Sequence, residues 1–146
     1  MHMRVSRQRS LISVGTILFL LGLLTGFAIP GFDNSRMGLA SHLEGVMNGT
    51  FLIALGAVWG HLQLTTRFES AAYWLLIYGA YANWIFVTFA AIFGTSAITP
   101  IAGKGYAGEA WQELIVSIGL GSVGIAMVLG AAILVYGFTK EKDVGI

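Results

Sequence analysis

The chain has no cysteine, two prolines and few charged residues, which make up 10% of its 146 positions. The absence of cysteine excludes disulfides, iron–sulfur clusters, thiolate haem ligands and Cys-type zinc sites. A soluble domain carries about 25% charged residues, so this chain has too few to cover an aqueous surface. The basic residues lie at segment ends rather than along one face, so we expect no nucleic-acid partner.

Hydrophobic residues are what the sequence has instead, at 56% of the chain. Four apolar stretches are long enough to cross a bilayer as helices, which needs about 20 residues each. We place these spans at residues 11–29, 42–64, 71–94 and 113–138. The sequence therefore predicts an all-α membrane protein, with residues 1–146 forming a single domain of four transmembrane helices in an antiparallel bundle. The long first apolar run lacks a good cleavage site, so we interpret it as a retained helix and not as a signal peptide.

The basic residues also predict the orientation of these spans. Two of them fall on one side of a four-span chain, Arg36 and Lys104. The other six fall on the opposite side: Arg4, Arg7, Arg9, Arg67, Lys140 and Lys142. Because basic residues are enriched in cytoplasmic loops, both termini are expected in the cytoplasm.

A polar stretch, "SHLEGVMNGT" at residues 41–50, stands at the start of the second predicted span. On an α-helix its polar side chains and glycines fall on one arc of about 160°. The arc contains Ser41, Glu44, Gly45, Asn48 and Gly49, and His42 closes it. A floor of glycine between polar flanks leaves room for something large and flat.

Three interpretations of this stretch are open from the residues alone. Ser41 and Glu44 match a capping box at a helix start, which explains neither His42 nor Asn48. The polar groups can also join subunits by hydrogen bonds. The third interpretation is a ligand site, because polar side chains inside a membrane usually mark function. Imidazole is the commonest metal ligand, so His42 is a candidate axial ligand of haem.

A second polar group lies midway along the third span, at Tyr78, Tyr81, Asn83 and Trp84. Asn83 needs a partner at that depth, either on another helix or on a substrate. The acids that precede the fourth span, Glu109 and Glu113, are interpreted as solvated first-turn residues favoured by the helix dipole.

Two further classes fit less well. A bis-histidine cytochrome is disfavoured because His42 and His61 lie about 28 Å apart along one helix. A transporter or channel needs a polar path through the whole membrane, whereas the polar arc covers half of one helix.

The run "RMGLASHLEGVMNGTFLIALG", residues 36–56, resembles the hydroxylaminobenzene mutases, which are small bacterial membrane enzymes. More distantly, His42, Asn48 and Gly49, together with Ala82-Asn83, resemble a His-x5-Asn-Gly motif and an Ala-Asn pair of styrene oxide isomerase. This resemblance implies a homotrimer in the bacterial inner membrane, with haem b near the subunit interface.

The resemblance also implies a reaction, the rearrangement of a small aromatic substrate such as hydroxylaminobenzene to a 2-aminophenol. It implies that His42 ligates the haem iron beside Gly45 and Gly49. For this reaction we expect Asn48 and Asn83 to orient the substrate and Tyr81 either to pass a proton or only to pack. Glu44 is either a helix cap or a base.

Epoxide isomerisation is the alternative reaction, and a non-enzymatic membrane haem or transport protein is another alternative. Gly79 and Val87 stand where the epoxide isomerases have an aspartate and a tyrosine, and Tyr81 stands where they have a tryptophan. These departures favour a different rearrangement.

Overall fold

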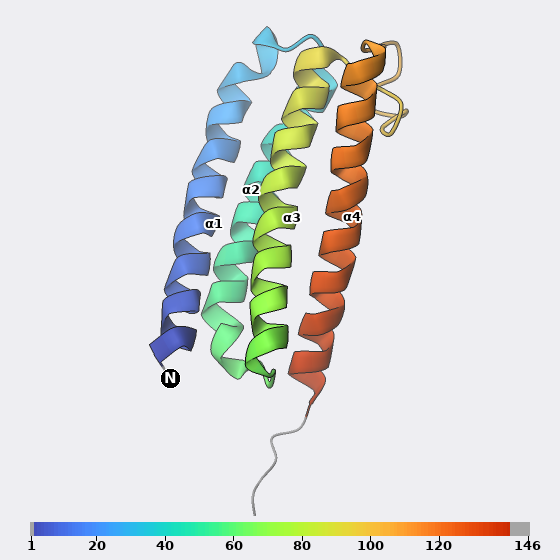
Figure 1. Cartoon of the computed structure of the whole chain (residues 1–146). Helices are drawn as coiled ribbons and strands as arrows, with labels where there is room; N and C mark the ends of the chain where they lie inside the picture. Colours follow the sequence, from blue (N-terminus) through green and yellow to red (C-terminus); the bar gives the residue numbers. More distant parts are fainter. Residues whose placement is uncertain (1, 141–146) are drawn as a thin grey trace, which may run out of the picture.

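The structure, a computed structural model, describes residues 2–140, with side chains described from residue 5 onward. It contains four long helices and two short 3-10 turns (Figure 1). In chain order these are α1 (His2–Ala28), η1 (Ile29–Gly31), α2 (Ser35–Val58), η2 (Trp59–His61), α3 (Thr66–Phe93) and α4 (Ala110–Thr139). All four long helices are long and apolar enough to cross a membrane, by length and composition. The predicted class, an all-helical protein with four helices able to span a membrane, is confirmed to this extent.

The four helices form a row in which each packs against the next (Figure 1). Among the described helices, α4 packs almost entirely on α3. The connections from α1 to α2 and from α3 to α4 lie at one end of the row, and the link from α2 to α3 lies at the other. The outer side of α4 is apolar and exposed, as expected of a surface in contact with lipid.

The helix bounds differ from the predicted spans, most of all for α2, which begins at Ser35 and not near His42. Asn34 is the reason, because its fully buried side chain accepts hydrogen bonds from the backbone N–H groups of Arg36 (3.0 Å) and Met37 (3.2 Å). Its amide nitrogen also donates to the Ala102 carbonyl, at 3.1 Å. The capping-box interpretation of Ser41 and Glu44 is therefore wrong, since both lie inside the helix.

Glycines set the close approach of α1 and α2. A Cβ added at Gly22 would lie 2.5 Å from the Val46 nitrogen, and one added at Gly49 would lie 2.5 Å from the Phe19 nitrogen. Gly45 faces Gly22 directly, backbone to backbone. Small residues permit such contact between helices in a membrane. We expected Gly45 and Gly49 to leave room for a flat cofactor. The structure corrects this expectation, because α1 fills the space over both glycines.

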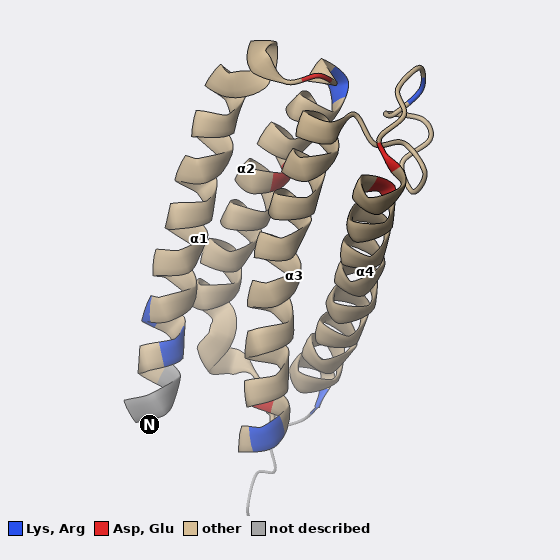
Figure 2. Ribbon diagram, turned by 45° about the horizontal axis from the view of Figure 1, so that its top comes forward, with Lys and Arg blue, Asp and Glu red and all other residues tan. Residues whose placement is uncertain are grey.

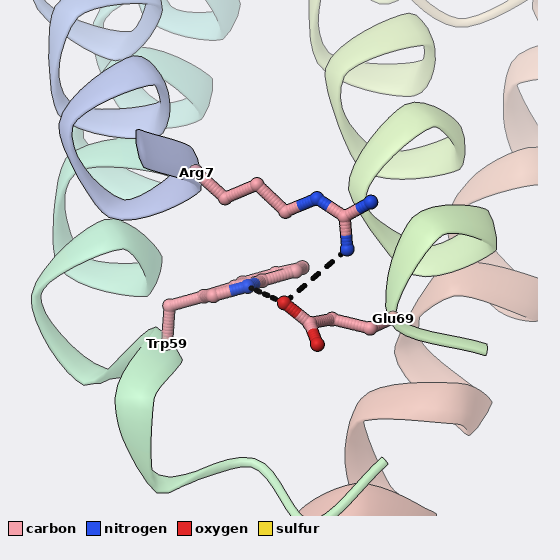
Figure 3. Close-up of polar contacts among 3 residues, drawn as sticks. All are labelled: Arg7, Trp59 and Glu69. Carbon is pink, nitrogen blue, oxygen red and sulfur yellow. Dashed lines mark hydrogen bonds and ion pairs between the residues drawn. The ribbon is translucent and has the colours of Figure 1, made fainter. Parts of the chain in front are cut away.

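Charged residues gather at the two ends of the molecule (Figure 2). At the end where α2 meets α3, Arg7, Trp59 and Glu69 form a polar cluster (Figure 3). The indole Nε1 of the fully buried Trp59 donates to Glu69 Oε1 at 3.0 Å, and Arg7 lies 3.2 Å from the same oxygen. The cluster joins α1, η2 and α3.

At the opposite end, Glu113 holds the loop that connects α3 to α4. Its carboxylate accepts hydrogen bonds from the backbone N–H groups of Ser96, Ala97 and Gly108, at 2.9–3.2 Å. Glu113 thus lies in the first turn of α4, as expected, and in addition binds the backbone of the preceding loop. Glu109, by contrast, is exposed and caps α4.

Candidate active site

One acidic residue lies within the apolar part of the row, at Glu44 of α2 (Figure 2, the red segment of that helix). At 1.5 Å per residue it is about 13 Å from the start of the helix. The side chain of Asn83, from α3, donates to Glu44 Oε2 at 2.6 Å. Asn48, one turn further along α2, donates to the same oxygen at 3.2 Å.

The register between α2 and α3 brings these three side chains together. Thr88 donates its hydroxyl proton to the Trp84 carbonyl, at 2.7 Å, and its oxygen lies 2.6 Å from the Ser41 hydroxyl. Because Thr88 has one hydroxyl proton, Ser41 is the donor of this second bond. This contact lies about one turn from Glu44 and fixes Asn83 opposite that carboxylate.

Among residues 5–140, the amides of Asn48 and Asn83 are the hydrogen-bond partners of Glu44, and no basic side chain pairs with it. Both amides bond to Oε2, so Oε1 remains without a partner in the described chain. An ionisable side chain within a membrane span is a candidate functional group by default.

His42 faces a different neighbour, helix α1. Its Nδ1 lies 2.8 Å from the Gly22 carbonyl oxygen, and a Cβ added at Gly26 would lie 2.9 Å from the same nitrogen. A carbonyl only accepts, so Nδ1 carries the proton and Nε2 of the neutral ring keeps its lone pair. This is the arrangement in which a histidine serves as a metal ligand.

The polar arc is therefore divided between two sides of α2. His42 contacts α1, whereas Glu44 and Asn48 contact the α3 side. Around the helix between His42 and Glu44 lie Leu43 and Met47, whose exposed fractions are 46% and 64%. An uncovered apolar surface thus lies beside the histidine, where it can receive a large apolar group.

The polar residues predicted in the third span, which lie in α3, also contact different neighbours. The Tyr81 hydroxyl donates to the Val14 carbonyl of α1 at 2.7 Å, and the Trp84 indole donates to the Thr25 hydroxyl at 3.1 Å. Asn83 alone of this group turns to Glu44. The structure therefore brings Asn48 and Asn83 together as expected candidates, and leaves Tyr81 on the α1 side.

Tyr78 points to the fourth helix, with its hydroxyl 2.6 Å from the Ser122 hydroxyl. Two surface grooves lie nearby, one of 630 Å³ on α3 and one of 500 Å³ between α3 and α4. The first is lined by Arg67, Ser70, Ala71, Trp74, Leu75 and Tyr78. Neither groove is lined by His42 or Glu44, so both are separate from the polar cluster.

Sequence reasoning missed Glu44 as the centre of the cluster. The available signal was a lone charge in an apolar span, four residues before an asparagine that shares its helix face. A local motif, the apparent capping box, provided a competing explanation.

No group of three or more His, Asp or Glu side chains in the described part of the chain can hold a bare metal ion. A haem iron needs only one protein ligand, and a histidine is the usual one. The geometry of His42 Nε2 fits that requirement.

Comparison with known proteins agrees with this architecture. The sequence profile of the styrene oxide isomerase family matches residues 7–139. Hydroxylaminobenzene mutase HabB of Ectopseudomonas oleovorans is 45% identical over 130 residues, which cover 88% of this chain and 79% of HabB. Hydroxylaminobenzene mutase HabA of the same organism is 42% identical over 134 residues, which cover 91% of this chain and 99% of HabA. No solved structure matches the chain.

The resemblance of residues 36–56 to the mutases thus extends over most of the chain and is confirmed. The chain belongs to the styrene oxide isomerase family and is an enzyme of the isomerase class.

Proposed function

We propose that this protein is a membrane-bound, haem-dependent mutase that rearranges an aryl hydroxylamine, such as hydroxylaminobenzene, to a 2-aminophenol. The observation that carries the proposal is its 42–45% identity to two hydroxylaminobenzene mutases over most of its length. The polar cluster of Glu44, Asn48 and Asn83 supports it, because a small aromatic substrate dissolved in lipid can reach polar groups at this depth.

The residues around His42 fit haem b. The lone pair of Nε2 is available for iron, and the exposed side chains of Leu39 and Leu43 offer apolar contact on the same side of α2. When bound, ferric haem supplies a Lewis acid that polarises the N–O bond of the substrate.

The protein itself binds and orients the substrate in this proposal. Asn48 and Asn83 each use one amide N–H for Glu44, which leaves a second N–H and a carbonyl oxygen on each for the substrate. Such donors act strongly where water is excluded. Tyr81 is a positioning residue, because its hydroxyl proton is used to hold α3 against α1.

We further propose that antiparallel four-helix protomers assemble as a homotrimer in the bacterial inner membrane, with haem near the subunit interface and both termini in the cytoplasm. The exposed apolar surface beside His42 supports this assembly, because a second protomer can cover it.

The test combines a spectrum with an assay. The purified protein, expressed with ample haem, is expected to show a Soret band and to convert hydroxylaminobenzene to 2-aminophenol. His42→Ala should lose both, whereas His61→Ala, at an exposed position near the other end of α2, should keep both.

Styrene oxide, assayed in parallel, tests the second candidate, an epoxide isomerase, which the family match favours. Turnover of styrene oxide alone would contradict the mutase proposal. Absence of a Soret band in the wild-type protein would contradict the haem proposal.

A further inference from the structure

We propose that the two grooves along α3 and α4 form one binding site for an anionic phospholipid with two acyl chains. In this site the phosphate of the headgroup contacts Arg67, and the acyl chains follow the two grooves on either side of Leu75. The site is separate from the polar cluster around Glu44, and it requires neither haem nor substrate.

The two grooves are neighbours on the surface of α3. The first is lined by side chains of α3 alone, which form one stripe along the helix from Arg67 to Tyr78. The second lies between α3 and α4, and its lining includes Phe68 and Tyr136, whose ring centroids are 6.3 Å apart. Leu75 lines both grooves, so they meet along this side chain. A ligand with two apolar chains joined at one head matches this arrangement.

The length of the grooves also matches an acyl chain. Arg67 and Tyr78 lie about 16 Å apart along the helix, at 1.5 Å per residue. The hydrocarbon layer of one leaflet is about 15 Å thick, half of the bilayer core. The second groove runs about 10 Å along α4, from Tyr136 to Leu129. Since Trp74 in the first groove keeps 64% of its surface exposed, the described chain leaves this groove open to lipid.

The polar end of the grooves carries positive charge that no carboxylate of the described residues neutralises. Arg67 is exposed and has no ion-pair partner in that part of the chain. The acid in the first turn of α3, Glu69, is buried and engaged by the cluster at the start of α1. Lys140, one turn beyond Tyr136 on α4, lies at the same end and is also exposed. Basic residues placed between helices at the edge of a membrane bind anionic headgroups.

The position of Arg67 adds to this charge. It lies in the first turn of α3, where the helix dipole is positive and a basic side chain is unfavourable. A phosphate there offsets both the guanidinium and the dipole. A zwitterionic headgroup brings a cation of its own, so the site should select lipids with a net negative charge. The grooves thus determine where the lipid lies, and the charge determines its class.

Native mass spectrometry can test the charge. The full-length protein, purified in detergent and freed of bound lipid, is titrated with phospholipids of identical acyl chains. Phosphatidylglycerol should bind more tightly than phosphatidylcholine. Arg67→Gln should weaken phosphatidylglycerol binding about five-fold, the usual contribution of one basic residue near an anionic surface, whereas Arg67→Lys should keep most of it. Lys104→Gln removes an exposed basic residue at the other end of the molecule and is the matched control.

A second pair of variants tests the grooves without changing the charge. Ala71→Trp fills the first groove and should weaken phosphatidylglycerol binding although Arg67 remains. Ala131→Trp, at an exposed position of α4 that lines neither groove, should bind as the wild type. Soluble glycerol phosphate, which lacks the chains, should not displace the lipid. Because all these positions are exposed, folding in lipid-free detergent should stay unchanged.

Selective binding of phosphatidylglycerol, weakened by Arg67→Gln and Ala71→Trp and kept in both controls, would support the site. Equal binding of the two phospholipids, or equal weakening by Arg67→Gln and Lys104→Gln, would overturn it in favour of unspecific lipid contact. Displacement by glycerol phosphate would overturn the role of the chains. If Ala71→Trp lowers the oligomeric mass and leaves lipid binding unchanged, another copy of the chain covers the groove, and the lipid proposal fails.

Discussion

At the scale of single residues, the orientation of His42 depends on two glycines of α1. The Gly22 carbonyl accepts the proton of Nδ1, and the ring lies against Gly26, where a side chain would collide with it. The two glycines thus determine which ring nitrogen is left for a ligand.

Gly26→Ala should therefore weaken the proposed binding of haem. The added Cβ would lie 2.9 Å from Nδ1, so the ring must shift and its bond to Gly22 must lengthen. Loss of a hydrogen bond behind a metal ligand typically lowers affinity about 10–100-fold. Haem titration of the apoprotein, followed by absorbance, measures the change. Gly124→Ala, which meets open space on α4, is the control, and equal affinities for the two variants would contradict this view of the His42 site.

At the scale of elements, hydropathy predicted the number and class of the helices. The bounds of the helices and the residues of the site depend on tertiary contacts, which hydropathy does not give. The sequence "SHLE" satisfies a local capping rule, yet Ser41 bonds to Thr88 and Glu44 to Asn83, both on another helix. The polar start of α2 lies outside the apolar window, so hydropathy alone did not detect it. Likewise, the helical arc grouped His42 with Glu44, because periodicity gives angles without showing which neighbour occupies each side.

The cluster of Arg7, Trp59 and Glu69 is expected to stabilise three elements at once. Glu69→Ala would leave a buried indole N–H and a largely buried guanidinium without their acceptor, Glu69 Oε1. Removal of one partner of a buried pair costs about 3 kcal/mol of folding stability or more. Denaturant unfolding in detergent measures the loss. Arg67→Ala, at a neighbouring exposed position, should change stability little, and equal effects of both variants would contradict the role of the cluster.

At the scale of the whole molecule, the charges of the described residues other than Glu44 lie at two ends, and the apolar helix faces lie between them (Figure 2). The link from α2 to α3 and the beginning of α1 share one end, and the loop at 94–109 lies at the other. Two of the eight basic residues counted for the orientation, Lys142 and the side chain of Arg4, lie outside the described residues. The orientation in the membrane therefore remains a prediction from the sequence.

Cysteine labelling can test that orientation, because the chain has no cysteine of its own. Thr66→Cys and Ile101→Cys place one thiol at each exposed end. A membrane-impermeant maleimide added to intact spheroplasts should label the cysteine at position 101 and reach the one at position 66 only after permeabilisation. The reverse pattern would invert the orientation.

The hydrogen bond between His42 and Gly22 has a consequence for mutational drift. Its acceptor is a main-chain carbonyl, a group that every amino acid brings to position 22. No side-chain replacement in α1 can delete that acceptor, although a larger residue can push the two helices apart. The position of the His42 ring is thus insensitive to the polarity of the α1 residues beside it and sensitive to their bulk.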